Sequence, residues 1–518
     1  MDGSNVMNDA GVVTVVFGRT GQFPIVDLPA MFTGRYTGFR IYGANSNDQL
    51  GYSVSSAGDF NNDGVDDIAI GAVAASPGGR TYAGVTYVLF GRRVTSGADA
   101  FQDIHLASYT LSPTTMIAFY GAVGYDLSGF AVSGAGDVNG DSIDDILVAA
   151  KGASPYGSRY DAGIVYVIFG TASPASAALS TIMTGVSHGY RIMGEENANE
   201  MGSFLSGAGD VNGDGLDDVI VGAPFAGAGF AYVIFSQSPH DDVDLNTFTL
   251  IDDTLGFIIM GAQAGDLAGL SVSRAGDFNG DLIGDVIVGA PSAVSAFGCA
   301  YVIFGHGTGQ GFPQIDLSSP DFVIFGESAG DMLGNAVSSA GDVNGDGFDD
   351  IIIGAYGADP FNRGEAGRVY VVFGYANPIN VVMQMSDFIT HASTGFIILG
   401  PAILSRAGMA VSGAGDVNGD GVADIIVGER GGDPVVGSTT RTDAGITYVV
   451  FGRPLSQGAA SAININLASF ASGSPLGYRI LGAAGGDSSG ISVKGAGDVN
   501  KDGVGDMIIG ATIVQNTS

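Results

Sequence analysis

The chain has 518 residues, with 53 acidic side chains against 19 basic ones and a formal net charge of −34. A polyanion of this size repels nucleic acids and anionic lipids, so we expect neither as a partner, and cations are its natural counterpart. The 46% hydrophobic and 14% charged residues, together with 86 glycines, are typical of a folded, turn-dense, strand-rich protein and exclude a disordered one.

The first residues, MDGSNVMNDAGVV, lack the basic and apolar regions of a signal peptide. No apolar run reaches the roughly 18 residues of a membrane-spanning helix, so we expect no direct membrane insertion. The single cysteine, Cys299, lies in the apolar run FGCAYVIFG and is expected to be a buried free thiol. The chain therefore has no disulfide framework.

In chain order, the first predicted elements are two strands, GVVTVVFG (11–18) and GFRIYG (38–43). An acidic motif then recurs seven times, each copy followed by an apolar run, as in AGDVNGDGLDDVIVGAP. The first aspartates of successive copies are 65 to 82 residues apart, which suits a four-stranded unit better than a helical hairpin. The copies begin at Ala57, Ala135, Ala208, Ala275, Ala340, Ala414 and Ala496.

Each unit carries four strand signals, which in the third copy are MGSFLSGAGD, DDVIVGAP, GFAYVIF and GFIIMG. The chain ends on the first two signals of a unit and begins on the last two. We therefore predict an all-β fold, a seven-bladed β-propeller of four-stranded antiparallel blades, closed by pairing N-terminal with C-terminal strands in one blade. The expected blades are approximately 51–121, 129–194, 202–261, 269–326, 334–400, 408–482, and 490–518 completed by 11–43.

The acidic motif predicts a loop that binds a hard cation. Counting from its first aspartate, side-chain oxygens occur at loop positions 1, 3, 5 and 9, a backbone carbonyl is available at position 7, and position 6 is usually glycine. Calcium accepts such a flexible set of six or more oxygens, whereas magnesium demands a stricter octahedron. We predict up to seven Ca²⁺ ions, one per blade. The expected ligands are Asp59, Asn61, Asp63, Val65 and Asp67; Asp137, Asn139, Asp141, Ile143 and Asp145; Asp210, Asn212, Asp214, Leu216 and Asp218; Asp277, Asn279, Asp281, Ile283 and Asp285; Asp342, Asn344, Asp346, Phe348 and Asp350; Asp416, Asn418, Asp420, Val422 and Asp424; Asp498, Asn500, Asp502, Val504 and Asp506.

A plain hairpin turn is the simpler interpretation of Asp-Asn-Gly clusters, but a turn needs only one or two of these residues. Dockerin modules and EF-hands also contain DVNGDG, yet they are helical and place their last acidic ligand near position 12. Here a strand follows position 9. Ser142 and Leu282 replace the glycine at position 6, so the weakest calcium binding is expected in those two loops.

The units resemble FG-GAP repeats, the blades of the integrin alpha-subunit head. The resemblance rests on the sevenfold D-x-N-x-D-G-x-x-D pattern and on GAP itself, which is present at residues 222–224 and 289–291. In place of the family's FG pair, the chain keeps only the glycine, as at Gly51 and Gly202. The resemblance implies adhesion or ligand binding.

Strand alternation places the acidic loops on the same face as the long connections between third and fourth strands. Integrin propellers bind partners on the face away from their calcium sites. The resemblance therefore implies a protein or glycan ligand on the face opposite the acidic loops. Ordinary solvated loops are the alternative interpretation. The arginines and aromatic residues expected there are Arg80, Tyr82, Tyr156, Arg159, Tyr160, Phe361, Arg363, Arg430 and Arg441.

Catalysis finds little support, because the five histidines are scattered, no HExxH occurs, and GDSSG (486–490) matches the nucleophile-elbow pattern only by its letters. The leading hypothesis is a non-catalytic, calcium-stabilised extracellular or cell-surface propeller for adhesion, ligand binding or surface assembly. The alternatives are a propeller domain of a larger secreted enzyme of the phospholipase type, or a glycan-binding module.

Overall fold

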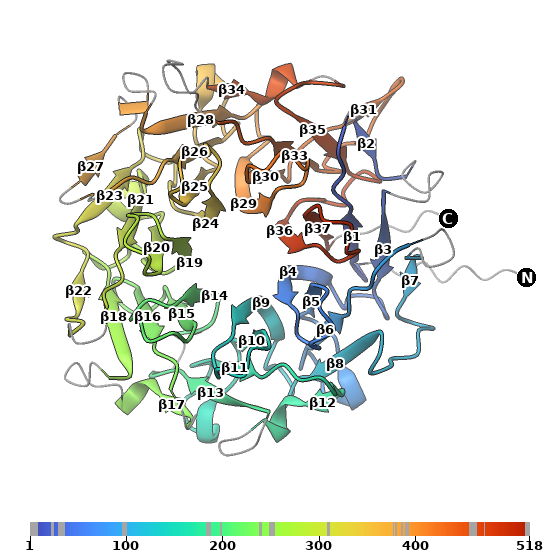
Figure 1. Ribbon diagram of the computed structural model, residues 1–518, viewed down its shortest axis with the longest axis vertical. Helices are drawn as coiled ribbons and strands as arrows, with labels where there is room; N and C mark the ends of the chain where they lie inside the picture. Colours follow the sequence, from blue (N-terminus) through green and yellow to red (C-terminus); the bar gives the residue numbers. More distant parts are fainter. Residues whose placement is uncertain are drawn as a thin grey trace, which may run out of the picture.

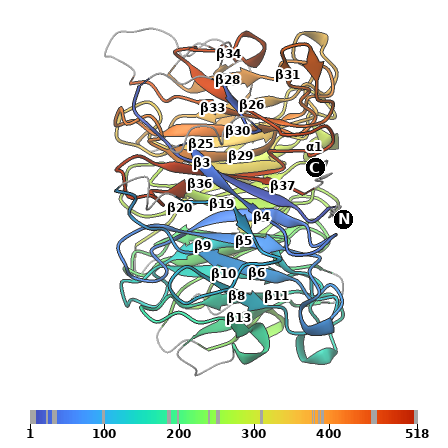
Figure 2. The same ribbon diagram turned by 90° about the vertical axis from the view of Figure 1, so that its right-hand side faces the viewer.

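The computed structural model describes residues 9–21, 25–29, 37–95, 101–182, 188–196, 199–237, 241–247, 254–307, 311–376, 378, 381–384, 387–388, 393–454, 464–470 and 472–512. Seven sheets are arranged in a ring (Figure 1), and Figure 2 shows the same ring edge-on. The strands nearest the axis of the ring line a central cavity, which we call the channel. The prediction of an all-β, seven-bladed propeller is confirmed.

The first two strands of each blade pair antiparallel, and the first of them lines the channel (Figure 1). The inner strands are β4 (Leu50–Gly58), β9 (Ser128–Gly136), β14 (Phe204–Gly209), β19 (Ser271–Gly276), β24 (Ala336–Gly341), β29 (Ala407–Gly415) and β36 (Ser492–Gly497). The second strands are β5 (Asp67–Ala72), β10 (Asp145–Ala150), β15 (Asp218–Ala223), β20 (Asp285–Ala290), β25 (Asp350–Ala355), β30 (Asp424–Glu429) and β37 (Asp506–Ala511).

The third and fourth strands continue each antiparallel sheet outward. The third strands are β6 (Val85–Leu89), β11 (Ile164–Ile168), β16 (Phe230–Ile234), β21 (Cys299–Ile303), β26 (Arg368–Val372), β33 (Ile446–Val450) and β1 (Val12–Val16). The fourth strands are β8 (Met116–Tyr120), β13 (Gly189–Met193), β18 (Gly256–Met260), β23 (Phe322–Phe325), β28 (Gly395–Leu399), β35 (Gly477–Leu481) and β3 (Gly38–Tyr42).

Each sheet has a fifth strand, which corrects the expectation of four per blade. It is two or three residues long, pairs parallel with the fourth strand, and comes from the long connection of the following blade. Such short segments carry no apolar alternation, so the sequence pattern does not reveal them. In blade order they are β12 (Ala177–Ala178), β17 (Val243–Asp244), β22 (Ile315–Asp316), β27 (Val381–Met383), β34 (Ile465–Asn466), β2 (Val26–Asp27) and β7 (Ile104–His105).

The seventh blade is built from both ends of the chain, as predicted. Strand β1 pairs antiparallel with β37 in the register Val12↔Ala511 to Val16↔Met507, and β3 pairs with the other edge of β1. Gly18 N–H also donates to Asp506 Oδ1 at 2.9 Å, across a sequence separation of 488 residues. These contacts close the ring.

The hydrophobic core lies between neighbouring blades, because the sheets face one another around the ring. One core cluster, for example, joins Leu147 and Val165 of the second blade to Val219 and Val221 of the third. Every residue of six of the second strands is buried, since both of their faces are covered by adjacent blades. The helix α1 (Ala293–Ala296) is a single turn, and no helix among the described residues is long and apolar enough to cross a membrane. A small hairpin, β31 (Val435–Val436) and β32 (Thr439–Thr440), extends one loop.

The sixth blade places a glutamate where the other second strands end in alanine. Glu429 is 2% exposed, and its Oε2 has no hydrogen-bond partner in the described structure. Burial raises the pKa of this carboxyl from 4.5 to about 7. The folded protein therefore favours the protonated form, and stability is lost as the pH rises from about 4.5 through 7.

We expect Glu429→Gln to be more stable than the parent chain by about 1–3 kcal/mol at pH 8 and equal to it below pH 4, because the amide cannot ionise. Unfolding free energies of both proteins at the two pH values, in saturating calcium, test this. An advantage that is equal at both values, or larger in acid, contradicts the assignment.

Candidate functional site

The seven acidic loops connect the inner strand to the second strand of each blade. The pairing of these strands shifts register just before the loop, as between Gly207 and Gly209 in the third blade. Gly209 has a φ of +75°, a left-handed conformation that glycine adopts without strain. This bulge turns the chain into the loop at Asp210.

Within the loop the aspartates organise the backbone. In the third blade Asp210 accepts hydrogen bonds from the N–H groups of Asp214 at 3.0 Å and Gly215 at 2.9 Å. Asp214 Oδ1 accepts from Leu216 N–H at 2.9 Å. The same three hydrogen bonds recur in the other six loops, so position 1 and position 5 fix one loop geometry throughout.

Position 9 is the buried end of the site and the first residue of the second strand. Asp218 Oδ2 accepts from Val211 N–H and its Oδ1 from Ser236 N–H, both at 2.9 Å, so the carboxylate joins the loop to the end of the third strand. All seven position 9 aspartates are 0% exposed. Burial raises the pKa of six of them to about 8 and that of Asp424 to about 7.

The loops fit a cation in three respects. No position 9 aspartate forms an ion pair with a basic side chain among the described residues, although buried carboxylates need a counter-charge. Asn61 Oδ1 and Asn500 Oδ1, both at position 3, are buried acceptors without a hydrogen-bond partner in the described structure. The candidate metal-ligand atoms are carboxylate, amide and carbonyl oxygens, which suit a hard cation.

As the side chains stand, no three Asp, Glu, His or Cys residues of the described chain form a preassembled metal cluster. The aspartates at positions 1 and 5 direct oxygens at backbone N–H groups of their own loop, and each oxygen retains a second lone pair for a cation. The predicted ligand residues are therefore gathered in each loop, and the metal itself stays a prediction.

Position 6 has the left-handed backbone expected from its glycines. Gly215 has a φ of +91°, and Ser142 and Leu282 are held at +67° and +69°. The Leu282 side chain is 92% exposed, so it returns no burial energy for this strain.

We expect Leu282→Gly to stabilise the protein by about 1 kcal/mol and to tighten calcium binding in that loop, because glycine adopts this φ freely. The reverse change Gly215→Leu should cost a similar amount, since a Cβ there meets no atom within 4 Å and only the backbone is strained. Unfolding free energies of the two variants test the pair, and a destabilised Leu282→Gly would contradict it.

Aspartates at position 8 connect adjacent loops, a role that the sequence interpretation missed. Asp144 Oδ2 accepts from Asp59 N–H of the preceding blade at 2.7 Å, and Asp217 Oδ2 accepts from Asp137 N–H at 2.9 Å. Asp349 and Asp66 do the same at two further junctions, whereas glycine or alanine stands at this position in the other three loops. The recurrent Asp-Asp pair before the second strand is the signal that could have revealed them.

The long connections lie on the face of the acidic loops, as predicted. Thr171 N–H, just after β11, donates to the carbonyl of Phe60 in the loop of the preceding blade at 2.9 Å. His306 and Tyr375 make the equivalent hydrogen bonds to Val211 and Phe278. The opposite face is left to the loops between second and third strands and to those between blades.

Most arginines predicted for a ligand surface are instead engaged within their own blade. Arg159 donates to the Gly194 carbonyl at 2.6 Å and pairs with Asp244. Arg363 donates to the Gly400 carbonyl at 2.7 Å, and Arg80 and Arg441 cap the equivalent fourth strands. Only Arg430, among the five, has no such contact in the described structure. The arginine set therefore supports the blades, and this function of the side chains was not predicted.

The aromatic residues predicted for this face are exposed. Tyr156 is 72% exposed and Phe361 67%, and Arg159 and Arg363 lie over their rings. Tyr82 contacts Tyr125 edge-on, with ring centroids 5.8 Å apart. An apolar surface therefore stands on this face of the ring.

Comparison with known proteins agrees with the fold and the loops. A model of the FG-GAP repeat matches residues 50–89, 128–168, 201–234, 333–372 and 407–450, which run from inner to third strands in five blades. The chain is thus a seven-bladed propeller that carries FG-GAP repeats. Integrin alpha subunits are its distant homologues.

Two integrins illustrate the distance. The chain is 28% identical to integrin alpha-5 of Xenopus laevis over 292 residues, which is 53% of this chain and 24% of the relative. It is 31% identical to integrin alpha-PS5 of Drosophila melanogaster over 196 residues, 36% of this chain and 19% of the relative. A phosphatidylinositol-glycan-specific phospholipase D of Bos taurus is 31% identical over 203 residues, 39% of this chain and 21% of the relative. The matched region spans less than a quarter of each of these relatives.

Proposed function

We propose that this chain is a non-catalytic, calcium-stabilised propeller that binds a protein or glycan partner through the face opposite the acidic loops. The observation that carries the proposal is the distribution of exposed apolar side chains. Eleven of the fourteen large apolar residues that are exposed in the described structure come from the loops of that face. They are Tyr82, Val123, Tyr125, Tyr156, Tyr160, Phe225, Val294, Phe361, Ile403, Leu404 and Val435.

Backbone strain at these residues supports a functional origin. Tyr156, Phe361 and Val294 have φ values of +54°, +55° and +53° at the tips of their loops. Bulky residues avoid this conformation, and strain of this kind gathers at binding sites. Gly78 stands at the equivalent tip of the first blade, with a φ of +59°. The fold accepts glycine there, so the large side chains serve something other than folding.

Calcium has a structural role in this proposal. Each ion would neutralise a buried aspartate and satisfy the loop oxygens, which fixes the hairpin between the first two strands. Five protein ligands without a bidentate glutamate at position 12 suit the millimolar calcium found outside cells. An extracellular or cell-surface location follows from this affinity.

The experiment compares the calcium-saturated chain with the double variant Tyr156→Gly/Phe361→Gly. Binding is measured on a glycan array, and adhesion is measured with protein-coated beads on cells. We expect the parent chain to bind and the double variant to bind with at least tenfold lower affinity. The melting temperature of the variant should stay equal or rise, because glycine relieves the backbone strain at two residues.

Leu282→Gly is the matched control, since it removes an exposed apolar side chain from the acidic-loop face. Its binding should equal that of the parent chain. Equal binding by the double variant, or no binding by the parent in either assay, would overturn the proposal.

A second candidate function is a propeller domain of a larger secreted enzyme. The similarity to a phospholipase D over 203 residues favours it. A catalytic domain encoded next to this segment, together with activity that depends on the same aromatic face, would support this candidate over adhesion.

A further inference from the structure

The central channel contains a cavity of about 890 Å³, lined by the inner strands and by the acidic loops at its mouth. A cavity of this size suits a small-molecule ligand. The residues four and three positions before the first aspartate are among its lining residues in all seven inner strands. The residue four before the first aspartate is serine in six blades, namely Ser55, Ser133, Ser206, Ser273, Ser338 and Ser412.

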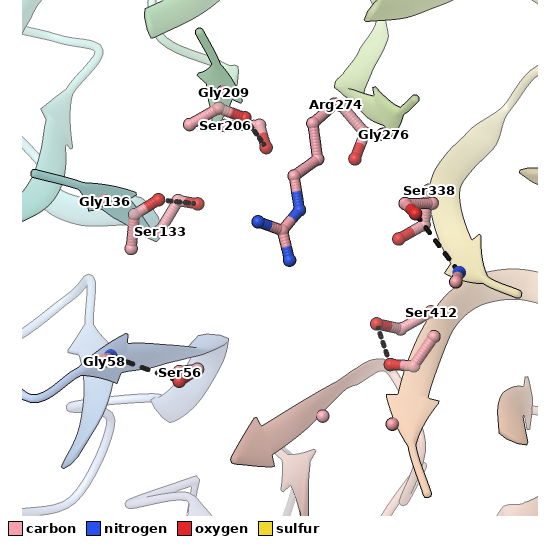
Figure 3. Close-up of a pocket in the computed structure, with 18 of the residues that line it drawn as sticks. Ser56, Gly58, Ser133, Gly136, Ser206, Gly209, Arg274, Gly276, Ser338 and Ser412 are labelled. Carbon is pink, nitrogen blue, oxygen red and sulfur yellow. Dashed lines mark hydrogen bonds between the residues drawn. The ribbon is translucent and has the colours of Figure 1, made fainter. Parts of the chain in front are cut away.

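Two basic residues interrupt this lining of small residues. Arg274 of β19 stands where the other blades have serine or glycine, and Lys494 of β36 takes the place of the seventh serine. Figure 3 shows the Arg274 side chain extending into the middle of the channel, among Ser206, Ser133 and Ser338. A chain with only 19 basic residues thus places two of them in one cavity.

Neither basic group has a hydrogen-bond or ion-pair partner among the described residues. The guanidinium of Arg274 is exposed to the channel, and Lys494 is half-buried. Burial, followed by the charge of Arg274, lowers the pKa of Lys494 to about 8, so most of its amines are charged at pH 7. The guanidinium of Arg274 and the amine of Lys494 are therefore hydrogen-bond donors without acceptors among the described residues.

Aspartates surround the mouth of the cavity, but none pairs with these cations. Burial raises the pKa of Asp217 and the charge of Arg274 partly opposes this rise, yet no ion pair joins the two side chains, and Asp217 accepts from Asp137 N–H instead. Asp144 and Asp349 are held in the same way, and Asp210, Asp277 and Asp498 belong to the acidic loops. A structural counter-ion to Asp217 would be expected to form a direct salt bridge.

We propose that the channel is a binding site for a small carboxylate, held by Arg274 and Lys494 within the ring of serine hydroxyls. The planar guanidinium binds a carboxylate through two parallel N–H donors, and the lysine supplies a second charge. Ser133, Ser206 and Ser412 donate their hydroxyl hydrogens to the carbonyl of the next residue, so the two cationic side chains are the main donors that a carboxylate would meet in the cavity. This site is separate from the aromatic face.

Succinate is the probe, in calorimetric titrations of the full, calcium-saturated chain at pH 7. The neutral, similarly shaped succinamide is the ligand control. We expect succinate to bind, and succinamide to bind at least tenfold more weakly. Arg274→Ser and Lys494→Ser should each weaken succinate binding at least tenfold, and both should fold, because other blades carry serine at the same positions.

Arg93→Ser is the matched control for charge, since Arg93 is exposed and lies outside the cavity. It should bind succinate as the parent chain does. The proposal is overturned if the parent chain fails to bind succinate, if succinamide binds equally, or if the Arg274 and Lys494 variants bind like the parent. A loss of bound calcium in Arg274→Ser with succinate binding unchanged would instead assign the arginine to the loops.

Discussion

Chelation with EGTA should lower the melting temperature of the protein by about 10–20 °C. Each site, at free calcium a hundredfold above its dissociation constant, contributes about 2.7 kcal/mol, and the acidic loops offer seven. A chain of this length changes its melting temperature by roughly 1 °C per kcal/mol. Without the metal, each loop brings the aspartates at positions 1 and 5 close to the buried carboxylate at position 9, which no basic side chain of the described residues neutralises.

Calorimetric melts in calcium and in EGTA, with metal analysis of the dialysed protein, measure this effect. Added magnesium should restore less stability than calcium, because it demands a stricter geometry. Identical melting temperatures in both buffers, or dialysed protein free of metal in its native form, would remove calcium from the proposal while leaving the propeller intact.

Asp218→Ala is expected to destabilise the protein by about 3–5 kcal/mol and to reduce the bound calcium by one ion. The substitution removes the carboxylate that accepts from the buried N–H groups of Val211 and Ser236, and each orphaned donor costs about 1–3 kcal/mol. It also removes the predicted calcium ligand at position 9. Denaturant unfolding and calcium titration measure the two effects separately.

Asp241→Ala is the control, because this exposed aspartate loses the same charge from the surface. Its stability should stay within about 0.5 kcal/mol of the parent chain. If Asp218→Ala were no less stable than the control, position 9 would not join the loop to the third strand.

The blades could be predicted from the sequence because each repeats one pattern of apolar runs and turns. The complementary ends 11–43 and 490–518 likewise predicted closure, which the pairing of β1 with β37 confirms. The fifth strands could not be predicted, because two residues in a long connection carry no periodicity and pair only once the neighbouring blade is in place.

The acidic loops could also be located residue by residue, since their aspartates and asparagines are local in the sequence, and their binding of calcium stays a prediction. The aspartates at position 8 were harder to assign, because Asp144 acts on a backbone group 85 residues earlier. Arg159 and its equivalents were placed on the correct face, but their hydrogen bonds to fourth-strand carbonyls depend on contacts that only the folded blade brings together. Local chemistry was predictable, and long-range partners were not.

The pairing of β1 with β37 also governs how the protein can be synthesised and folded. Strands β1 and β3 leave the ribosome before the other strands of the propeller, yet the sheet edge of β1 gains its partner β37 only after nearly 500 further residues have been made. Until then that edge is an open template for other chains, and the last loop closure is slow. Nascent chains should therefore depend on chaperones to shield the early strands until the final blade assembles.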